Sequence, residues 1–311
     1  MMPNFLIVGA AKSGTTSLHY YLNQHPQIFM SRKKEPRFFA PEFYTEYHYD
    51  SNQRSLRSVP MSLDEYCALF DEVSDETVVG ESSPEYLYFP SSPVLIKRHI
   101  PDVKLAVILR DPSERAFSAY CYHVREGRES KTFEQALRDE ENKISCCMRP
   151  GWFYIDCGFY YMQLKRYFDI FDADQIRIYL HDELLMGADF VCRDIFHFLG
   201  VNEHFLPDLT RKNISKIPQF SILNRLGSSR SPAARTLKKW LPRSISQQLS
   251  AVKKLNLVDK PALSEATRSY LVQIYREDIL KLQDLIQRDL SSWLCISRKT
   301  TSKVFSKVSS V

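Results

Sequence analysis

The sequence of 311 residues lacks several features that would assign it to a common class of protein. No apolar run approaches the roughly 20 residues that a membrane span needs. The first apolar segment, typical of a strand, begins about four residues from the start, so we expect no signal peptide. The seven cysteines are odd in number and none has C-x-x-C spacing. We therefore expect reduced thiols, no bound metal, no transmembrane segment and a cytoplasmic location.

A strong charge of one sign and an internal repeat are also missing. The net charge is +5, which fits an enzyme with an anionic substrate and fits an ordinary charge balance equally well. It carries no argument for nucleic-acid binding, and we expect no nucleic-acid partner. With 44% hydrophobic and 13% aromatic residues the chain can bury a large core. We expect one domain over residues 1–296, with an insertion at about 40–60, a lid or acceptor region at about 210–260 and a disordered tail at 297–311.

The N-terminal segment has the pattern of a phosphate-binding loop. Residues 5–8 are four apolar residues that suit a buried parallel strand, and Gly9 ends it. Gly14 allows a tight turn in which successive backbone N–H groups point at an anion. Residues 15–17 (Thr-Thr-Ser) then begin a helix, whose N-terminal dipole and unpaired N–H groups attract that anion.

The loop differs from that of a nucleotide triphosphatase in the place of its lysine. Gly9 and Gly14 keep the P-loop spacing, but Thr15 takes the position of the usual lysine and Lys12 lies inside the loop. From there, Lys12 would meet the end of a phosphate chain from a different side.

A second strand-to-helix segment follows at residues 105–120. The apolar strand ends at Arg110, and Pro112 suits the first turn of the helix because its missing N–H costs nothing there. Ser118 lies two turns into this helix. Asp111 also follows the strand and invites comparison with the magnesium-binding aspartate of an ATPase, but its neighbours Arg110 and Pro112 suit a phosphate clamp better.

Together these two segments resemble the sulfotransferases that use 3′-phosphoadenosine-5′-phosphosulfate (PAPS), in particular their heparan-sulfate-type and bacterial branch. The resemblance implies that the loop holds the 5′-phosphate through Lys12, Ser13, Gly14, Thr15, Thr16 and Ser17. It implies that Arg110 and Ser118 hold the 3′-phosphate, and that PAPS is the cosubstrate and 3′-phosphoadenosine-5′-phosphate (PAP) the product, without a metal. It covers roughly residues 4–220 and the last helix.

The same resemblance and the alternation of elements predict an α/β fold similar to that of P-loop NTPases. We expect three α/β/α layers around a central, mainly parallel sheet. Strands are predicted at residues 5–8, 27–30, 78–80, 105–110 and 175–180, and helices at about 15–24, 62–70, 92–99, 112–120, 156–168, 189–199 and 264–290. Ser62 and Glu65 form a capping box, and Gly200 is a plausible C-terminal cap.

Glu35 is the candidate catalytic base. It lies in a Lys-Glu-Pro-Arg-Phe-Phe segment, where aromatic neighbours would partly desolvate a carboxylate at the edge of the phosphate site. The segment resembles the one that carries the catalytic glutamate in heparan-sulfate-type sulfotransferases. Taken alone, the residues leave open that Glu35 merely pairs with Lys34 or Arg37 on a solvated turn. His48, in an aromatic-rich stretch, is kept in reserve because no histidine lies in the motif of the histidine-based subfamily.

The segment after the strand at 78–80 resembles the family in a third place. Glu81 would lie at the carboxyl edge of the sheet, as an alternative base, an acceptor-orienting group or a turn cap. The heparan-sulfate enzymes often have lysine at the next position, whereas this chain has Ser82. A later basic segment, with Arg211 and Lys212, resembles the loop that folds over PAPS, although a solvated charge cluster is the competing interpretation.

Lys12 is the second candidate catalytic residue. Sulfuryl transfer has a loose, in-line transition state, so negative charge accumulates on the bridging oxygen as its bond to sulfur breaks. An ammonium placed there stabilises the transition state more than the ground state.

The sequence thus predicts a sulfotransferase that moves a sulfuryl group from PAPS to a hydroxyl or amine of a small natural product or a carbohydrate. For a flat or cationic acceptor, aromatic and acidic side chains should line the pocket. Two alternatives remain open: a P-loop kinase or NTPase that needs magnesium and ATP, and a non-catalytic protein that binds PAPS or PAP. The sequence does not give the acceptor or the oligomeric state.

Overall fold

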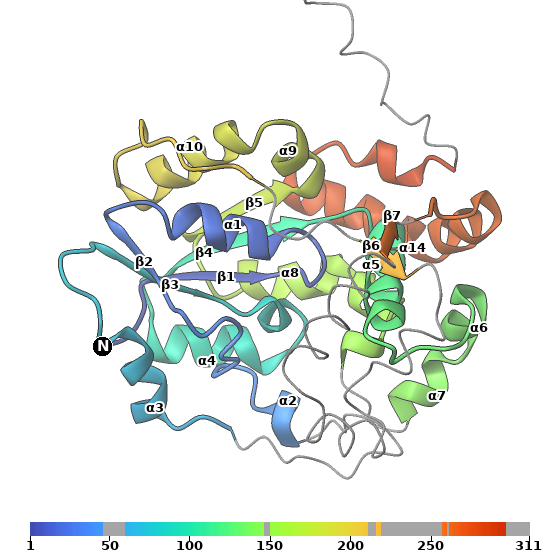
Figure 1. Cartoon of the computed structure of the whole chain (residues 1–311), viewed down its shortest axis with the longest axis horizontal. Coiled ribbons are helices and arrows are strands. Elements are labelled where there is room, and N and C mark those ends of the chain that lie inside the picture. Colours follow the sequence, from blue (N-terminus) through green and yellow to red (C-terminus); the bar gives the residue numbers. More distant parts are fainter. Residues whose placement is uncertain (46–59, 146–149, 211–215, 219–256, 260, 297–311) are drawn as a thin grey trace, which may run out of the picture.

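The structure, a computed structural model, describes residues 1–45, 60–145, 150–210, 216–218, 257–259 and 261–296 (Figure 1). A five-stranded sheet forms the centre. Its strands lie in the order β2 (Ile28–Met30), β3 (Val78–Ser82), β1 (Phe5–Gly9), β4 (Lys104–Leu109) and β5 (Ile176–Leu180). All four neighbouring pairs are parallel. This confirms the expected α/β fold with a parallel sheet.

One face of the sheet is covered by three helices, α1 (Thr15–Leu22), α9 (His181–Met186) and α10 (Ala188–Leu199), which lie above the sheet in Figure 1. Alternate strand residues point to this side because successive side chains of a strand face opposite ways. Phe5 and Ile7 of β1 pack here with Leu18 of α1 and Ile195 of α10, and all four are fully buried.

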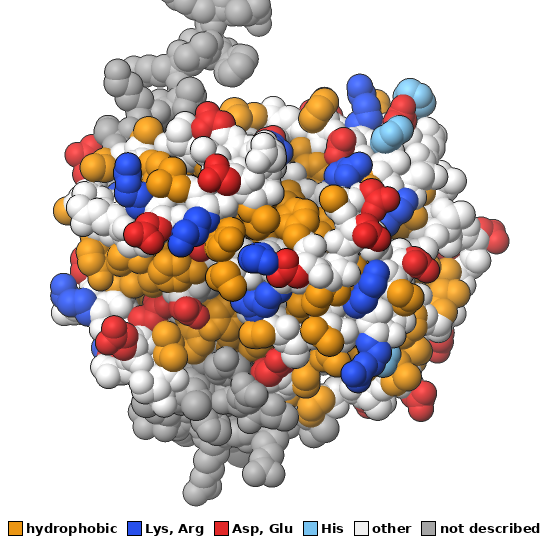
Figure 2. Space-filling view, turned by 180° about the vertical axis from the view of Figure 1, so that it is seen from behind, with side chains coloured by type: hydrophobic (Ala, Val, Ile, Leu, Met, Phe, Trp, Pro, Cys, Tyr) orange, Lys and Arg blue, Asp and Glu red, His pale blue; other side chains and the backbone are white. Residues whose placement is uncertain are grey.

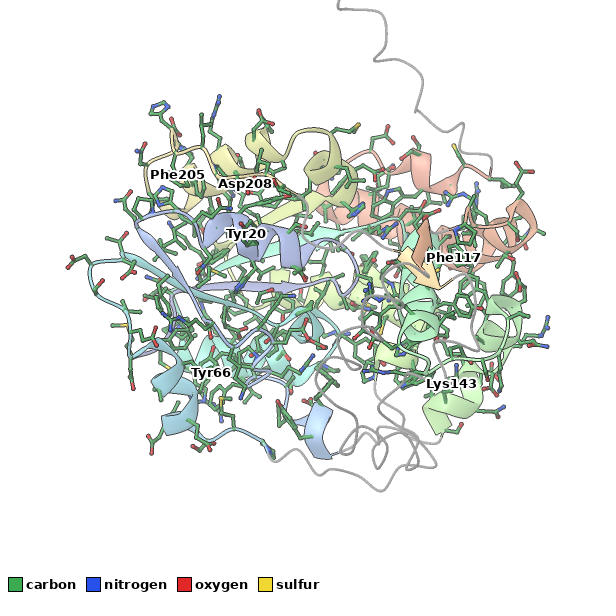
Figure 3. All side chains as sticks on the ribbon, in the orientation of Figure 1. Tyr20, Tyr66, Phe117, Lys143, Phe205 and Asp208 are labelled. Carbon is green, nitrogen blue, oxygen red and sulfur yellow. The ribbon has the colours of Figure 1, made fainter. Side chains whose placement is uncertain are left out.

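The other face is covered by α3 (Leu63–Cys67), α4 (Ser91–His99), α5 (Pro112–Arg125), α8 (Tyr160–Phe168) and α14 (Glu265–Ile286). The intervening strand residues Leu6 and Val8 join this cluster, together with Tyr66 of α3. Figure 3 places Tyr66 below the sheet, and Phe205, which packs on the first cluster, above it. The sheet is therefore the middle of three layers, as predicted.

Several shorter elements complete the described residues: helices α2 (Glu42–Thr45), α6 (Phe133–Arg138) and α7 (Glu140–Ser145), 3-10 turns at Ala68–Phe70, Pro84–Leu87, Pro150–Trp152, Asp156–Gly158, Ala173–Gln175 and Ser291–Leu294, and an antiparallel pair of strands, β6 (Lys216–Pro218) and β7 (Leu257–Asp259). The Pro84–Leu87 turn follows β3 directly. It brings residues beyond the strand to the carboxyl edge of the sheet.

The predicted element boundaries differ from the observed ones where a tertiary contact ends or begins a helix. A helix was expected from Asp156, but that stretch is a 3-10 turn, and α8 begins at Tyr160, where the Asp278 carboxylate accepts the Tyr160 N–H at 2.8 Å. The last helix ends at Ile286 rather than near residue 290, because Gln287 adopts φ 52°. The Ser62–Glu65 capping box and the Gly200 cap are confirmed.

Some expectations lie outside the described residues. These are most of the insertion at 40–60, most of the region at 210–260, and the tail at 297–311. Within the part of the chain that is described, no helix has the length and apolarity needed to cross a membrane.

The surface carries charges of both signs. On the face shown in Figure 2, turned by 180° from Figure 1, Lys and Arg side chains are interspersed with Asp and Glu side chains and with apolar ones. This agrees with the small net charge of +5.

Candidate functional site

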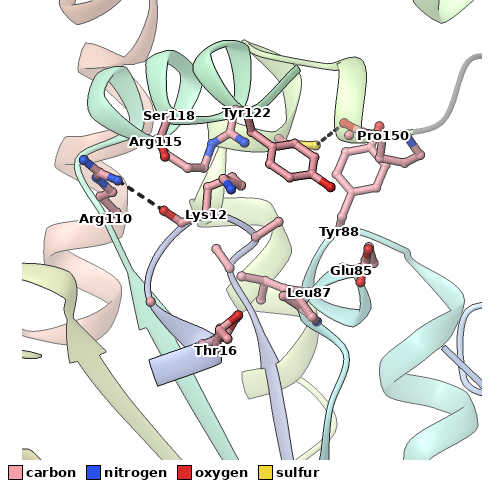
Figure 4. Close-up of a pocket in the computed structure, with 18 of the residues that line it drawn as sticks. Lys12, Thr16, Glu85, Leu87, Tyr88, Arg110, Arg115, Ser118, Tyr122 and Pro150 are labelled. Carbon is pink, nitrogen blue, oxygen red and sulfur yellow. Dashed lines mark hydrogen bonds between the residues drawn. The ribbon is translucent and has the colours of Figure 1, made fainter. Parts of the chain in front are cut away.

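A cavity of about 780 Å³ lies at the carboxyl ends of β1, β3 and β4 (Figure 4). Ligands of open α/β sheets bind at this edge. Eight of the residues predicted from the sequence line it: Lys12, Gly14, Thr15, Thr16, Ser17, Glu35, Arg110 and Ser118. Segments more than 100 residues apart in the sequence are therefore brought to one place.

The loop between β1 and α1 presents backbone N–H groups at the start of a helix. Gly14 is the N-cap of α1 with φ 106°, and no side chain caps this end of the helix. The first-turn N–H groups and the helix dipole suit this terminus to an anion. A Cβ on Gly14 would lie 2.9 Å from Leu184 Cδ2, in a conformation that L side chains rarely adopt, so the position requires glycine. Ser13 is fully buried and does not line the cavity.

Lys12 points into the middle of the cavity. Its Nζ lies 4.3 Å from the centroid of the Tyr122 ring. Burial, together with the nearby Arg125 and Arg110 guanidiniums, lowers the pKa of Lys12 to about 8. The two arginines repel the Lys12 ammonium. An anion with several negative charges would offset this repulsion, so the site is suited to such an anion.

Arg110 and Ser118 lie at one end of the cavity (Figure 4). Arg110 precedes α5, and Ser118 lies about two turns into that helix. Arg110 Nη1 donates to the Lys12 carbonyl oxygen at 3.3 Å, which connects Arg110 to the loop between β1 and α1. Its Nη2 lies 3.4 Å from the Glu114 carboxylate. Arg110 is therefore held in place while it lines the cavity.

Asp111 is a structural residue. It accepts hydrogen bonds from the Ser113 and Glu114 N–H groups at the start of α5 and forms a buried ion pair of 2.7 Å with Arg268 of α14. These contacts agree with the sequence interpretation, which did not assign Asp111 as a magnesium ligand. Among the residues that the structure describes, no group of three or more His, Cys, Asp or Glu side chains could hold a metal ion.

Glu35 faces the cavity within a network of charges. Its carboxylate contacts Arg37 and lies 3.3 Å from Lys34 Nζ. Arg37 also pairs with Glu85 at 2.7 Å. The ion pairing that the sequence left open is thus present, and it occurs in a cavity wall, where the Glu35 side chain is 30% exposed.

The backbone around Glu35 is held in an unusual conformation. Glu35 and Arg37 have φ of 59° and 56°, values that non-glycine residues adopt at a cost. Two hydrogen bonds fix the turn: the Glu35 N–H donates to the Ser82 carbonyl at 3.1 Å, and the Arg37 N–H donates to Ser83 Oγ at 3.0 Å. The end of β3 therefore determines where Glu35 points.

Glu81 lies behind this turn. It is fully buried, accepts the Ser83 hydroxyl at 2.9 Å and lies 3.4 Å from the Tyr66 hydroxyl. It is absent from the cavity wall. Its contacts suit a group that orients Ser83, and through Ser83 the Glu35 turn, better than a base that touches an acceptor.

Burial raises the pKa of Glu81 from 4.5 to about 7. Below pH 4.5 the carboxyl is neutral in both folded and unfolded chains, and between pH 4.5 and 7 only the unfolded chain releases the proton. The free energy of unfolding should thus fall over this window, by on the order of 3 kcal/mol. We expect Glu81→Gln to remove this contribution to the pH dependence of denaturant unfolding, measured at pH 5 and pH 8.

The control for this prediction is Glu72→Gln, the same change at a residue whose side chain is 56% exposed and pairs with Arg32 on the surface. It should retain the wild-type slope. A Glu81→Gln protein with the wild-type slope would show that Glu81 is ionised in the folded chain at pH 5.

The sequence reasoning missed several residues of the cavity wall. Tyr122 and Arg125 follow Ser118 by four and seven positions on α5, so helical spacing from Ser118 would have found them. Glu85 follows Glu81 by four positions, but only the turn after β3 shows that it faces the cavity. Tyr88 and Trp152 come from turns that the pattern did not predict.

Three predicted site residues, His48, Arg211 and Lys212, lie outside the described residues. Their predicted roles stay predictions. The reserve base His48 gains no support from the geometry.

Comparison with known proteins gives a consistent result. The model of the sulfotransferase family matches residues 3–148. A solved structure, a sulfotransferase from Alicyclobacillus acidocaldarius, superposes with a TM-score of 0.73 at 33% identity, covering 94% of this chain and 99% of the other.

Curated relatives match over parts of their length. The membrane-associated sulfotransferase kil1 of Dictyostelium discoideum is 30% identical over 154 residues, 48% of this chain and 30% of that protein. The bifunctional heparan sulfate N-deacetylase/N-sulfotransferase 4 of Mus musculus is 24% identical over 309 residues, 94% of this chain and 31% of that protein. The chain thus spans about a third of the length of these curated relatives.

Proposed function

The chain belongs to the sulfotransferase family, and on that premise we propose that it transfers a sulfuryl group from PAPS to a hydroxyl or amine of a small molecule or a carbohydrate. The observation that carries the proposal is the position of Lys12. It lies in the loop that precedes the N-terminus of α1, its carbonyl oxygen accepts from Arg110, and Arg110, Ser118 and Glu35 line the same cavity. PAPS fits this arrangement, because it has phosphates at two positions and a sulfuryl group that would lie between the 5′-phosphate and the acceptor.

The proposed donor contacts follow from the cavity wall. The N-terminal N–H groups of α1 and the hydroxyls of Thr15, Thr16 and Ser17 would hold the 5′-phosphate. Arg110 and Ser118 would hold the 3′-phosphate, since a planar guanidinium can donate two parallel hydrogen bonds to phosphate. Arg211 and Lys212 are proposed as further contacts, on the family resemblance alone.

The proposed transfer step is an in-line displacement at sulfur. The acceptor oxygen or nitrogen attacks sulfur, the bond from sulfur to the bridging oxygen breaks, and the electron pair of that bond leaves on the 5′-phosphate of PAP. Glu35 takes the acceptor proton, and Lys12 stabilises the charge on the bridging oxygen. The step needs no metal ligand.

The class of acceptor is also a proposal. The names of several relatives contain heparan sulfate, which supports a carbohydrate acceptor, whereas the aromatic cavity wall supports a small molecule. A single domain over residues 1–296 and a cytoplasmic location remain predictions. The five described cysteines are free thiols, as the cytoplasmic prediction requires.

Calorimetric titration with PAP in the absence of magnesium tests the donor site. We expect micromolar binding, and we expect Arg110→Ala to weaken it about 10- to 100-fold because a charge-assisted phosphate contact is lost. Arg32→Ala, which removes an arginine paired on the surface, is the matched control and should bind PAP as the wild type does. Magnesium-dependent ATP binding without PAP binding would instead favour the kinase or NTPase alternative.

A further inference from the structure

The end of the cavity opposite Arg110 carries an acidic group that the proposed transfer does not use. Glu85 lies in the Pro84–Leu87 turn and lines the cavity, with its side chain 16% exposed. Figure 4 shows Glu85, Tyr88 and Pro150 on one side of Lys12 and Tyr122, with Arg110 and Ser118 on the other. Glu85 therefore lies where an acceptor would enter, away from the donor clamp.

One oxygen of Glu85 has a partner and the other does not. Oε1 accepts from Arg37 Nη2 at 2.7 Å. Oε2 is buried and has no hydrogen-bond partner among the described residues. A buried carboxylate oxygen left without a donor is costly, so the site favours a ligand that brings one.

The single positive charge of Arg37 is shared between two carboxylates, Glu85 and Glu35, so it does not fully neutralise Glu85. The second cation near Glu35, Lys34, contacts Glu35 and Thr16. Two further cavity arginines, Arg125 and Arg128, lie near the Tyr122 ring, with their Cζ atoms 5.2 and 5.6 Å from its centroid. Arg115, which also lines the cavity, is buried and donates to the Tyr154 carbonyl oxygen at 2.5 Å. Positive charge is thus gathered around Tyr122, and the acceptor end keeps a carboxylate.

The walls around Glu85 are apolar and aromatic. Phe43, Leu87, Tyr88, Pro150 and Trp152 line the same cavity. Tyr88 is oriented by its hydroxyl, which donates to the Asp156 carboxylate at 2.5 Å. Aromatic faces beside a carboxylate form a site for a flat molecule with a cationic group.

We propose that Glu85 is a specificity-determining residue that selects an aromatic acceptor bearing a protonated amine in addition to the group that is sulfated. This inference rests on the proposed sulfotransferase activity. The amine would pair with the partly exposed Glu85 carboxylate, and the ring would lie against Tyr88 and its apolar neighbours. A carboxylate at the same place on the acceptor would meet Glu85 with like charge and is selected against.

Three phenols of nearly equal size but different charge test this: tyramine (cation), tyrosol (neutral) and 3-(4-hydroxyphenyl)propionate (anion). With PAPS as donor, we expect kcat/KM for tyramine to exceed that for the propionate by at least about tenfold, the scale of one charge-assisted hydrogen bond. In Glu85→Gln the ratio should fall below about threefold. Glu72→Gln, an identical change on the surface, should keep the wild-type ratio.

The ratio of kcat/KM for two acceptors is compared within each variant. A general loss of activity, caused by the loss of the Arg37–Glu85 ion pair, affects both acceptors and cancels in the ratio. Equal rates for the amine and the acid, a preference for the acid, or an amine preference that survives Glu85→Gln would each overturn the proposal. So would failure to sulfate any of the three phenols by a protein that binds PAP. Failure to bind PAP would instead refute the proposed function itself, so the two failures are distinguishable.

Discussion

Replacing Lys12 with methionine should lower kcat for sulfuryl transfer from PAPS about 10²- to 10³-fold, the usual cost of removing one preorganised group that stabilises transition-state charge. Methionine keeps an unbranched apolar stem against the Tyr122 ring, so the loss reports the ammonium rather than the packing. PAP affinity should fall much less than kcat, because the helix terminus and Arg110 still hold the phosphates. Single-turnover release of PAP with 4-methylphenol as acceptor measures the rate.

The pH dependence offers a second measure of the same residue. Since the pKa of Lys12 is lowered to about 8 in the unliganded protein, kcat/KM should decline above that pH as the ammonium is lost. Lys33→Met, the same change at an exposed lysine, should retain both the rate and the decline. If Lys12→Met turned over at the wild-type rate, Lys12 would have no role in the departure of PAP.

Replacing Glu35 with glutamine should lower kcat by about 10²- to 10⁴-fold for a weakly acidic acceptor, because the proton of the attacking group then has no carboxylate to accept it. The loss should depend on the acceptor. 4-Nitrophenol is partly ionised near neutral pH and should lose little, whereas 4-methylphenol needs a base and should lose most. Comparison of the two phenols in wild type and Glu35→Gln measures this directly.

The control for Glu35 has to separate proton transfer from charge balance, because Glu35 contacts Arg37 and Lys34. PAP affinity in Glu35→Gln should stay within about twofold of wild type if the donor site is undisturbed. Equal losses for the two phenols would contradict the base assignment. That result would leave Glu35 as a partner that positions Arg37.

The parts of the fold that could be predicted from the sequence are those where the pattern is local. The strand at residues 5–9, the loop to Gly14 and the Arg110 segment are short patterns whose chemistry depends on near neighbours in the sequence. The parallel sheet followed from buried apolar strands that alternate with helices. The capping box at Ser62 is equally local.

The rest depends on contacts between distant segments. The Glu35 turn is fixed by the end of β3, 46 or 47 residues away, so its positive φ values could not be foreseen from its own sequence. The start of α8 is set by Asp278, more than 100 residues later. Glu85 looked like one acidic residue among many until the turn after β3 placed it in the cavity wall.

Turnover of ³⁵S-labelled PAPS in the presence of EDTA, with tyramine, tyrosol and a glucosamine oligosaccharide offered separately, decides whether this chain transfers sulfuryl groups. We expect PAP and a labelled product in equal amounts with at least one acceptor, and loss of both in Lys12→Met. Intact PAPS with every acceptor, beside magnesium-dependent hydrolysis of ATP, would contradict this expectation. Tight PAP binding without turnover would point to a non-catalytic binding protein.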